Sequence, residues 1–163
     1  MMQVAGKGAW GVLVAFVVLV SPFGVSAQAP ERLTLADALK IIDAAQKDAA
    51  AKNVNLSIAV VDGRGDLVAL ARMPGAGPNT ADTAIGKAMM SAIYGQPSAA
   101  LVSRATSPTT QALNDATGGR LRFIQGGVPI IRAGFLIGGV ATSGAASTVD
   151  ESVSKAALAA VMP

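Results

Sequence analysis

Two short apolar segments joined by a glycine-containing turn constrain the fold of this chain more than any other feature. Ser57–Val61 and Leu67–Arg72 are apolar at most positions, and residues 62–66 between them contain two glycines. Because glycine adopts positive φ without strain, the turn can be tight, and the pattern predicts a β-hairpin. Both faces of the hairpin are apolar, so we expect it in the middle of a sheet that is covered on both sides.

The first 27 residues have the pattern of a secretory signal peptide. Lys7 precedes an apolar run over residues 9–20, and Val25-Ser26-Ala27 supplies the small residues that signal peptidase prefers. The run is shorter than the roughly 20 apolar residues of a spanning helix, which favours cleavage over a membrane anchor. We therefore expect one domain over residues 28–163, in the periplasm or outside the cell and without membrane contact after cleavage.

Histidine and cysteine are both absent from the 163 residues. Their absence excludes disulfides, Ser-His-Asp and Cys-His catalysis, and the usual ligands of zinc and haem iron. The net charge is +3 and the basic residues do not cluster, so nucleic acid is not an expected partner. The chain is poorly equipped as an enzyme, although a mechanism based on Ser-Lys or on carboxylates stays open.

Hydrophobic periodicity predicts three longer helices besides the hairpin. Thr34 is suited to be the N-cap of the first, with Asp37 in the first turn, where a negative charge favours the helix dipole. Thr80 is the expected cap of the second, and Thr148 with Glu151 predicts a capping box for the third. The helices are expected from 35 to about 52, from 81 to about 94 and from 149 to 161. The first is expected to bury Leu35, Ala38, Leu39, Ile42, Ala45 and Ala49.

Three further strands are predicted towards the C-terminus, which makes the sheet five-stranded. They are expected over Arg120–Gln125, Val128–Arg132 and Phe135–Thr142. Pro129 cannot donate a ladder hydrogen bond, so the second of them is placed at an edge. Residues 98–117 are expected to be a long loop with short helical turns over 99–104 and 109–115. Without regular β-α-β alternation, the order predicts an α+β fold, a largely antiparallel sheet flanked by helices.

Several short motifs occur in an order typical of one protein family. They are Leu33–Ala38, Ser57–Asp62, Arg72-Met73, Lys87-Ala88, Gly126–Pro129, Ile137–Gly144 and Asp150-Glu151. In this combination the chain resembles the GlcG/HbpS-like (DUF336) proteins over nearly all of residues 28–163. The resemblance implies a profilin-like sandwich that assembles into homo-oligomers. It also implies haem binding with a role in redox stress, for which a sensor protein would be the partner, or a role in glycolate utilisation.

The resemblance makes haem or a related tetrapyrrole the leading candidate ligand. Iron needs an axial donor, and the propionates need cations. With histidine absent, Met73 and Tyr94 are the candidate metal ligands, and the alternative for each is ordinary packing at the edge of the core. In lacking histidine, the chain differs from relatives that bind haem through a histidine ligand. This difference argues against tight haem binding with histidine as the iron ligand.

Five further positions are candidates for binding a ligand. Arg72 and Lys87 can each bind a carboxylate or propionate, or else form an ion pair with an aspartate such as Asp150. The backbone N–H groups of Gly126 and Gly127 can bind an anion, or else serve only turn geometry. Asp150 can meet a ligand at the start of the last helix, or else complete the helix cap.

Three functions follow from these observations. The leading one is a secreted or periplasmic protein that binds haem or a related tetrapyrrole, for haem sequestration or redox sensing. The second is an accessory protein or enzyme acting on a small hydroxy or keto acid, with Arg72 and Lys87 holding the anion. The third is a structural homo-oligomer without a ligand.

Overall fold

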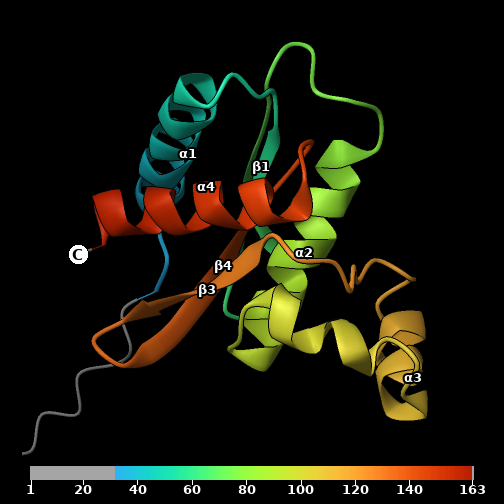
Figure 1. Ribbon diagram of the computed structural model, residues 1–163. Coiled ribbons are helices and arrows are strands. Elements are labelled where there is room, and N and C mark those ends of the chain that lie inside the picture. Colours follow the sequence, from blue (N-terminus) through green and yellow to red (C-terminus); the bar gives the residue numbers. More distant parts are fainter. Residues whose placement is uncertain (1–31, 163) are drawn as a thin grey trace, which may run out of the picture.

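The computed structural model describes residues 32–162, which form an antiparallel sheet with helices on both faces (Figure 1). The strands of these residues are β1 (Ser57–Asp62), β2 (Leu67–Arg72), β3 (Gly127–Arg132) and β4 (Phe135–Ser143). Their order in the sheet is β2-β1-β4-β3. The helices are α1 (Leu35–Ala51), α2 (Thr80–Tyr94), the 3-10 helix η1 (Ser98–Arg104), α3 (Pro108–Ala116) and α4 (Ser147–Val161). The α+β class is confirmed, and the predicted signal peptide lies outside the described residues.

Two helical layers sandwich the sheet. The α1 and α4 helices cover one face, where Ile58 and Val60 of β1 enter the larger apolar core. The α2 helix covers the other face, where Ala59 and Val61 of the same strand enter a second core. Since successive side chains of a strand point to opposite faces, β1 supplies both cores and is buried along nearly its whole length. Among the described residues, no helix is long and apolar enough to cross a membrane.

Glycines on two strands bring α2 unusually close to the sheet. A Cβ added at Gly139 of β4 would lie 2.4 Å from the carbonyl oxygen of Ala88. A Cβ added at Gly127 of β3 would lie 2.4 Å from the carbonyl oxygen of Lys87. Any side chain at these positions would push the helix away, so glycine there sets the height of α2 and of Lys87 over the sheet.

The predicted cap of α1 is confirmed and extends to a full capping box. The Asp37 N–H donates to the Thr34 hydroxyl oxygen, and the Thr34 N–H donates to Asp37 Oδ2, each at 3.1 Å. Asp37 also forms an ion pair with Arg132 at the end of β3, with an N–O distance of 3.2 Å. The predicted buried face is wrong at Leu35 and Leu39, which are 56% and 53% exposed. The buried side chains of α1 are Ala38, Ile41, Ile42, Ala45 and Ala49.

The predicted strand over Arg120–Gln125 is absent from the described structure, so the sheet has four strands rather than five. The backbone of this segment is bonded elsewhere. The Leu121 N–H donates to the side chain of Asn114 at 2.9 Å, and the Arg122 N–H donates to the Gly86 carbonyl at 3.4 Å. The Ser98 hydroxyl donates to the Ile124 carbonyl at 2.8 Å. The segment therefore pairs with α2, η1 and α3 instead of a strand.

The placement of the hairpin is correct for β1 and wrong for β2. The β1 strand is central, but β2 is an edge strand whose side chains are all exposed or half-buried. The α2 helix lies mainly over β4 and β1, which leaves Leu67 and Leu70 of β2 exposed. The central position of β4 and the edge position of β3, inferred from Pro129, are confirmed. The short helices predicted in the long loop correspond to η1 and α3.

Two predicted helix starts differ from the structure. The N-cap of α2 is Asn79, one residue before Thr80, whose hydroxyl donates to the Gly77 carbonyl instead. The N-cap of α4 is Ala146, and the predicted box between Thr148 and Glu151 does not form. No side chain caps the start of α4; Asp150 in the first turn instead accepts from the Ala145 N–H, just before the helix, at 3.1 Å.

We predict that Thr34→Ala lowers the free energy of unfolding by about 1 kcal/mol at pH 7, because it removes the N-cap of α1. The hydrogen bond from Thr34 is the largest cause that lowers the pKa of Asp37 below its usual 3.8. A group with a lowered pKa stabilises the fold above its unfolded pKa, and this contribution disappears as the pH falls through the folded value. The deficit measured by urea unfolding should therefore shrink below pH 3.8.

Thr148→Ala is the matched control, because Thr148 is exposed and makes no capping bond. Its effect should stay within about 0.5 kcal/mol at every pH. Equal costs for the two substitutions would contradict the assignment of the cap to Thr34.

Candidate functional site

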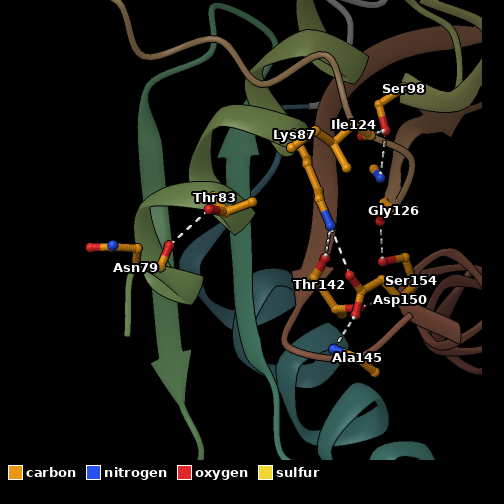
Figure 2. A network of polar contacts seen from close by, with 11 residues as sticks. Asn79, Thr83, Lys87, Ser98, Ile124, Gly126, Thr142, Ala145, Asp150 and Ser154 are labelled. Carbon is orange, nitrogen blue, oxygen red and sulfur yellow. Dashed lines mark hydrogen bonds and ion pairs between the residues drawn. The ribbon is translucent and has the colours of Figure 1, made fainter. Parts of the chain in front are cut away.

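A buried ion pair lies where the C-terminal end of β4 meets α2 and α4. Lys87 of α2 is 2% exposed, and its Nζ donates to Asp150 Oδ2 of α4 at 2.8 Å. The same Nζ donates to the Thr142 carbonyl oxygen of β4 at 3.2 Å. Figure 2 shows the lysine side chain reaching from α2 to both partners. Since α2 and α4 belong to opposite layers, the pair connects the two faces of the sandwich.

Asp150 is held from several sides. Its Oδ1 accepts from the Ala145 N–H, and its backbone carbonyl accepts from the Thr142 hydroxyl at 2.8 Å. Its side chain is 2% exposed, like that of Lys87. The carboxylate is the counter-ion of Lys87, which is the alternative that the sequence left open for the lysine. Asp150 makes no cap hydrogen bond to α4, whose N-cap is Ala146. A buried charge pair with its remaining hydrogen bonds satisfied can be stable in the fold.

Gly126 and Gly127 lie directly beside this pair. Gly126 has φ +138°, and a Cβ there would come within 2.8 Å of Lys87 Nζ and 3.1 Å of the Asp150 Cβ. The Gly126 carbonyl accepts from the Ser154 hydroxyl, and the Gly127 N–H donates to Ser98 Oγ, both at 2.8 Å (Figure 2). The Gly127 N–H predicted to bind an anion is therefore already engaged by Ser98.

The other three predicted site residues lie apart from the ion pair. Arg72 is exposed at the end of β2, and its guanidinium donates to the carbonyl of Ala76. Met73 packs against the core on the α1 and α4 side of the sheet. Tyr94 packs against the core on the α2 side, with the Arg104 guanidinium 5.5 Å from its ring centroid. Met73 and Tyr94 thus lie on opposite faces of the sheet and do not form a joint metal site.

A cavity of about 410 Å³ opens at the other end of the sheet, where β1 ends and β4 begins. Its walls come from the segment before α1, the turn between β1 and β2, and the start of β4. The lining residues are Arg32, Leu33, Asp62, Gly63, Arg64, Leu136 and Ile137. Sequence reasoning did not single out this set, because its three segments are distant along the chain. The combination of two arginines with apolar side chains suits a ligand with an apolar body and an anionic group.

Residues 32–162 contain no cluster of three or more acidic, histidine or cysteine side chains that could hold a metal ion. In the same part of the chain, Ser91 Oγ and Glu151 Oε2 are buried without a hydrogen-bond partner. The other oxygen of Glu151 pairs with Lys155, so only one half of that carboxylate is satisfied. Neither atom belongs to a residue that lines the 410 Å³ cavity.

A family model described as "Haem degrading protein HbpS-like" matches residues 33–159. The chain belongs to the HbpS-like family. The match confirms the resemblance inferred from the ordered motifs, and it includes the ion pair and most of the cavity lining. No curated protein matches the chain in a sequence comparison.

Solved structures of HbpS-like proteins have the same architecture. A double mutant of HbpS from Streptomyces reticuli is 28% identical, with a TM-score of 0.71, and the match covers 91% of this chain and 100% of that one. The ORFY protein of Klebsiella pneumoniae is 27% identical, with a TM-score of 0.73 and coverage of 82% and 93%. A haem complex of PduOC is 26% identical, with a TM-score of 0.71 and coverage of 81% and 96%.

We predict that Gly126→Ala destabilises the protein by about 3 kcal/mol or more. The methyl group would collide with Lys87 Nζ and would also occupy a backbone conformation that only glycine adopts easily. Gly118→Ala is the control, because Gly118 has φ +71° and no atom within 4 Å of an added Cβ. Gly118→Ala should therefore lower the free energy of unfolding only by the backbone strain, about 1 kcal/mol. Thermal and urea unfolding would contradict the prediction if both variants lost equal stability.

We predict that Lys87→Met lowers the free energy of unfolding by about 3–5 kcal/mol, because it leaves the Asp150 carboxylate buried and unpaired. Adding Asp150→Asn should recover at least half of this loss, since the amide removes the charge and can still accept from the Ala145 N–H. A double-mutant cycle in urea measures the coupling.

Lys47→Met is the control for the loss of one lysine charge. Lys47 pairs with Asp43 at the surface, where its side chain is 76% exposed, so its removal should cost less than about 1 kcal/mol. Additive effects of Lys87→Met and Asp150→Asn would show that the two side chains are not coupled.

Proposed function

We propose that this protein binds haem or a related tetrapyrrole. The observation that carries the proposal is the match to the HbpS-like family over residues 33–159, together with the likeness to the haem complex of PduOC. The match to PduOC covers 81% of this chain and 96% of PduOC at 26% identity, so the likeness includes the sequence as well as the fold. Bound haem would supply an iron that changes oxidation state, as a redox-sensing role requires.

The side chains of this protein restrict how haem can be held. The sequence has no histidine and no cysteine, so iron cannot be ligated by imidazole or thiolate from this chain. Met73 and Tyr94 are the predicted donors, but they lie on opposite faces of the sheet and cannot ligate one iron together. The proposal therefore depends on contacts with the porphyrin ring and its propionates rather than on a pair of axial ligands.

We also propose that the protein is secreted and forms a homo-oligomer. The signal-like sequence over residues 1–27 supports a periplasmic or secreted location. Exposed apolar side chains on β2 and α2, namely Leu67, Leu70 and Ile93, support burial between subunits of a homo-oligomer. In such a setting the protein would sequester haem or report redox stress to a sensor protein.

Titration of the mature protein with hemin should give a saturable change of the Soret band at micromolar protein. Light scattering beforehand gives the subunit number, so that the stoichiometry is expressed per subunit. We expect the spectrum to lack the low-spin signature of bis-imidazole ligation, because histidine is absent. A titration that never saturates would overturn the proposal. So would spectra identical to those of the same hemin concentrations in buffer without protein.

Met73→Leu and Tyr94→Phe test the two predicted iron ligands, because each substitution keeps most of the side-chain volume and removes the donor atom. A Soret band that moves in one variant identifies that residue as a ligand. Bands identical to that of the wild type in both variants exclude both residues.

A further inference from the structure

The cavity at the β1–β4 end of the sheet has a defined construction. Gly63 of the turn lies against β4, since a Cβ there would be 3.6 Å from the Leu136 carbonyl oxygen. Leu33 lies over Gly138, where a Cβ would come within 3.1 Å of the leucine Cδ2. A side chain at Gly138 would displace Leu33, whereas a Cβ at Gly63 would make an ordinary van der Waals contact. The cavity lies between these two contacts with β4, and the side chains of Arg32 and Arg64 complete its lining.

The apolar part of the cavity is accessible to a ligand. Ile137 is buried at 6% exposure, Leu33 is half-buried and packs against the core, and Leu136 is 38% exposed. These aliphatic side chains offer a surface for a flat apolar group. The volume of about 410 Å³ lies in the lower half of the range for ligand pockets, roughly 300–1,000 Å³. A tetrapyrrole would therefore insert one edge and leave the remainder outside.

The charged part of the cavity favours an anion. Arg32 and Arg64 are both exposed lining residues, whereas Asp62 is the single acidic one in that lining. Asp62 Oδ1 is occupied by the backbone N–H groups of Arg64 and Asp66, at 2.8 and 3.0 Å. The ion pair of Arg64 with Asp66 is mostly in solvent, with side chains 83% and 62% exposed, so a ligand carboxylate can replace it at small cost.

We propose that this cavity binds the carboxylate-bearing edge of a tetrapyrrole, with Arg32 and Arg64 holding the carboxylates and Leu33 and Leu136 contacting the ring. Naming a tetrapyrrole rests on the proposed function, whereas the position and the mode of recognition come from the cavity. Arginine suits this role because its planar fork matches a carboxylate. The lining contains no His, Cys, Met or Tyr. Recognition is thus directed at the carboxylates and the ring, and not at the iron.

Binding of metal-free protoporphyrin IX tests this mode of recognition directly. The mature protein should bind hemin and metal-free protoporphyrin IX with Kd values within about threefold of each other, since the iron contributes less than the ring and carboxylates. Quenching and shift of the porphyrin fluorescence measure the binding of metal-free protoporphyrin IX. Binding of hemin with no binding of the metal-free porphyrin would overturn the inference, because it would assign recognition to the iron.

The paired substitution Arg32→Ala/Arg64→Ala tests the position of the site. We expect it to weaken both ligands by about tenfold or more. Lys47→Ala/Arg120→Ala is the control, because it removes the same charge from exposed positions outside the cavity, and it should change Kd by less than about twofold. Circular dichroism and the thermal midpoint establish that each variant is folded.

The outcomes separate this inference from the proposed function. If Arg32→Ala/Arg64→Ala binds hemin as tightly as the wild type, the cavity assignment is wrong and haem binding by the protein stands. If both paired variants lose affinity equally, the effect is one of net charge and the assignment is again wrong. If the wild type binds no hemin, the proposed function fails as well.

Discussion

The buried ion pair of Lys87 and Asp150 is the contact on which the arrangement of the two helical layers depends. Removing two charges from water costs several kcal/mol for each ion, and the cost is offset only when the charges meet in good geometry. That geometry requires α2 at the height set by Gly127 and Gly139, Asp150 held by the Ala145 N–H at the start of α4, and no side chain at Gly126. One pair of side chains therefore links the positions of two helices, the end of β4 and the entry to β3.

The sequence predicted the existence of most elements, because their signals are local. Thr34 and Asp37 are three residues apart and cap α1 as expected, and Pro129 identified an edge strand. The failures have tertiary causes. Residues 120–125 alternate like a strand, but Asn114, Gly86 and Ser98 take their backbone hydrogen bonds. Leu35 and Leu39 fit an apolar stripe along a helix. The α4 helix packs against α1, however, and the side of α1 that is buried includes Ile41 instead.

The candidate site was accessible to sequence reasoning only in part. Lys87, Asp150 and the two glycines were each singled out from their residue type, and the pairing of Lys87 with Asp150 was one of several open alternatives. Lys87 and Asp150 are 63 positions apart in the sequence, so no local signal would have selected their pairing. The cavity was missed altogether, because Arg32 and Arg64 look like ordinary surface residues until the fold brings their segments to the same strand end.

The two ends of β4 are electrostatically separate. Ile137 at the cavity and Thr142 at the ion pair are five residues apart on one extended strand, which corresponds to about 17 Å. Lys87 and Asp150 carry opposite charges 2.8 Å apart, so at that distance their fields largely cancel. The buried ion pair therefore has little influence on the potential at the cavity. Over evolutionary time, the lining at one strand end can diversify towards other anionic ligands while the other end continues to hold the helices in place.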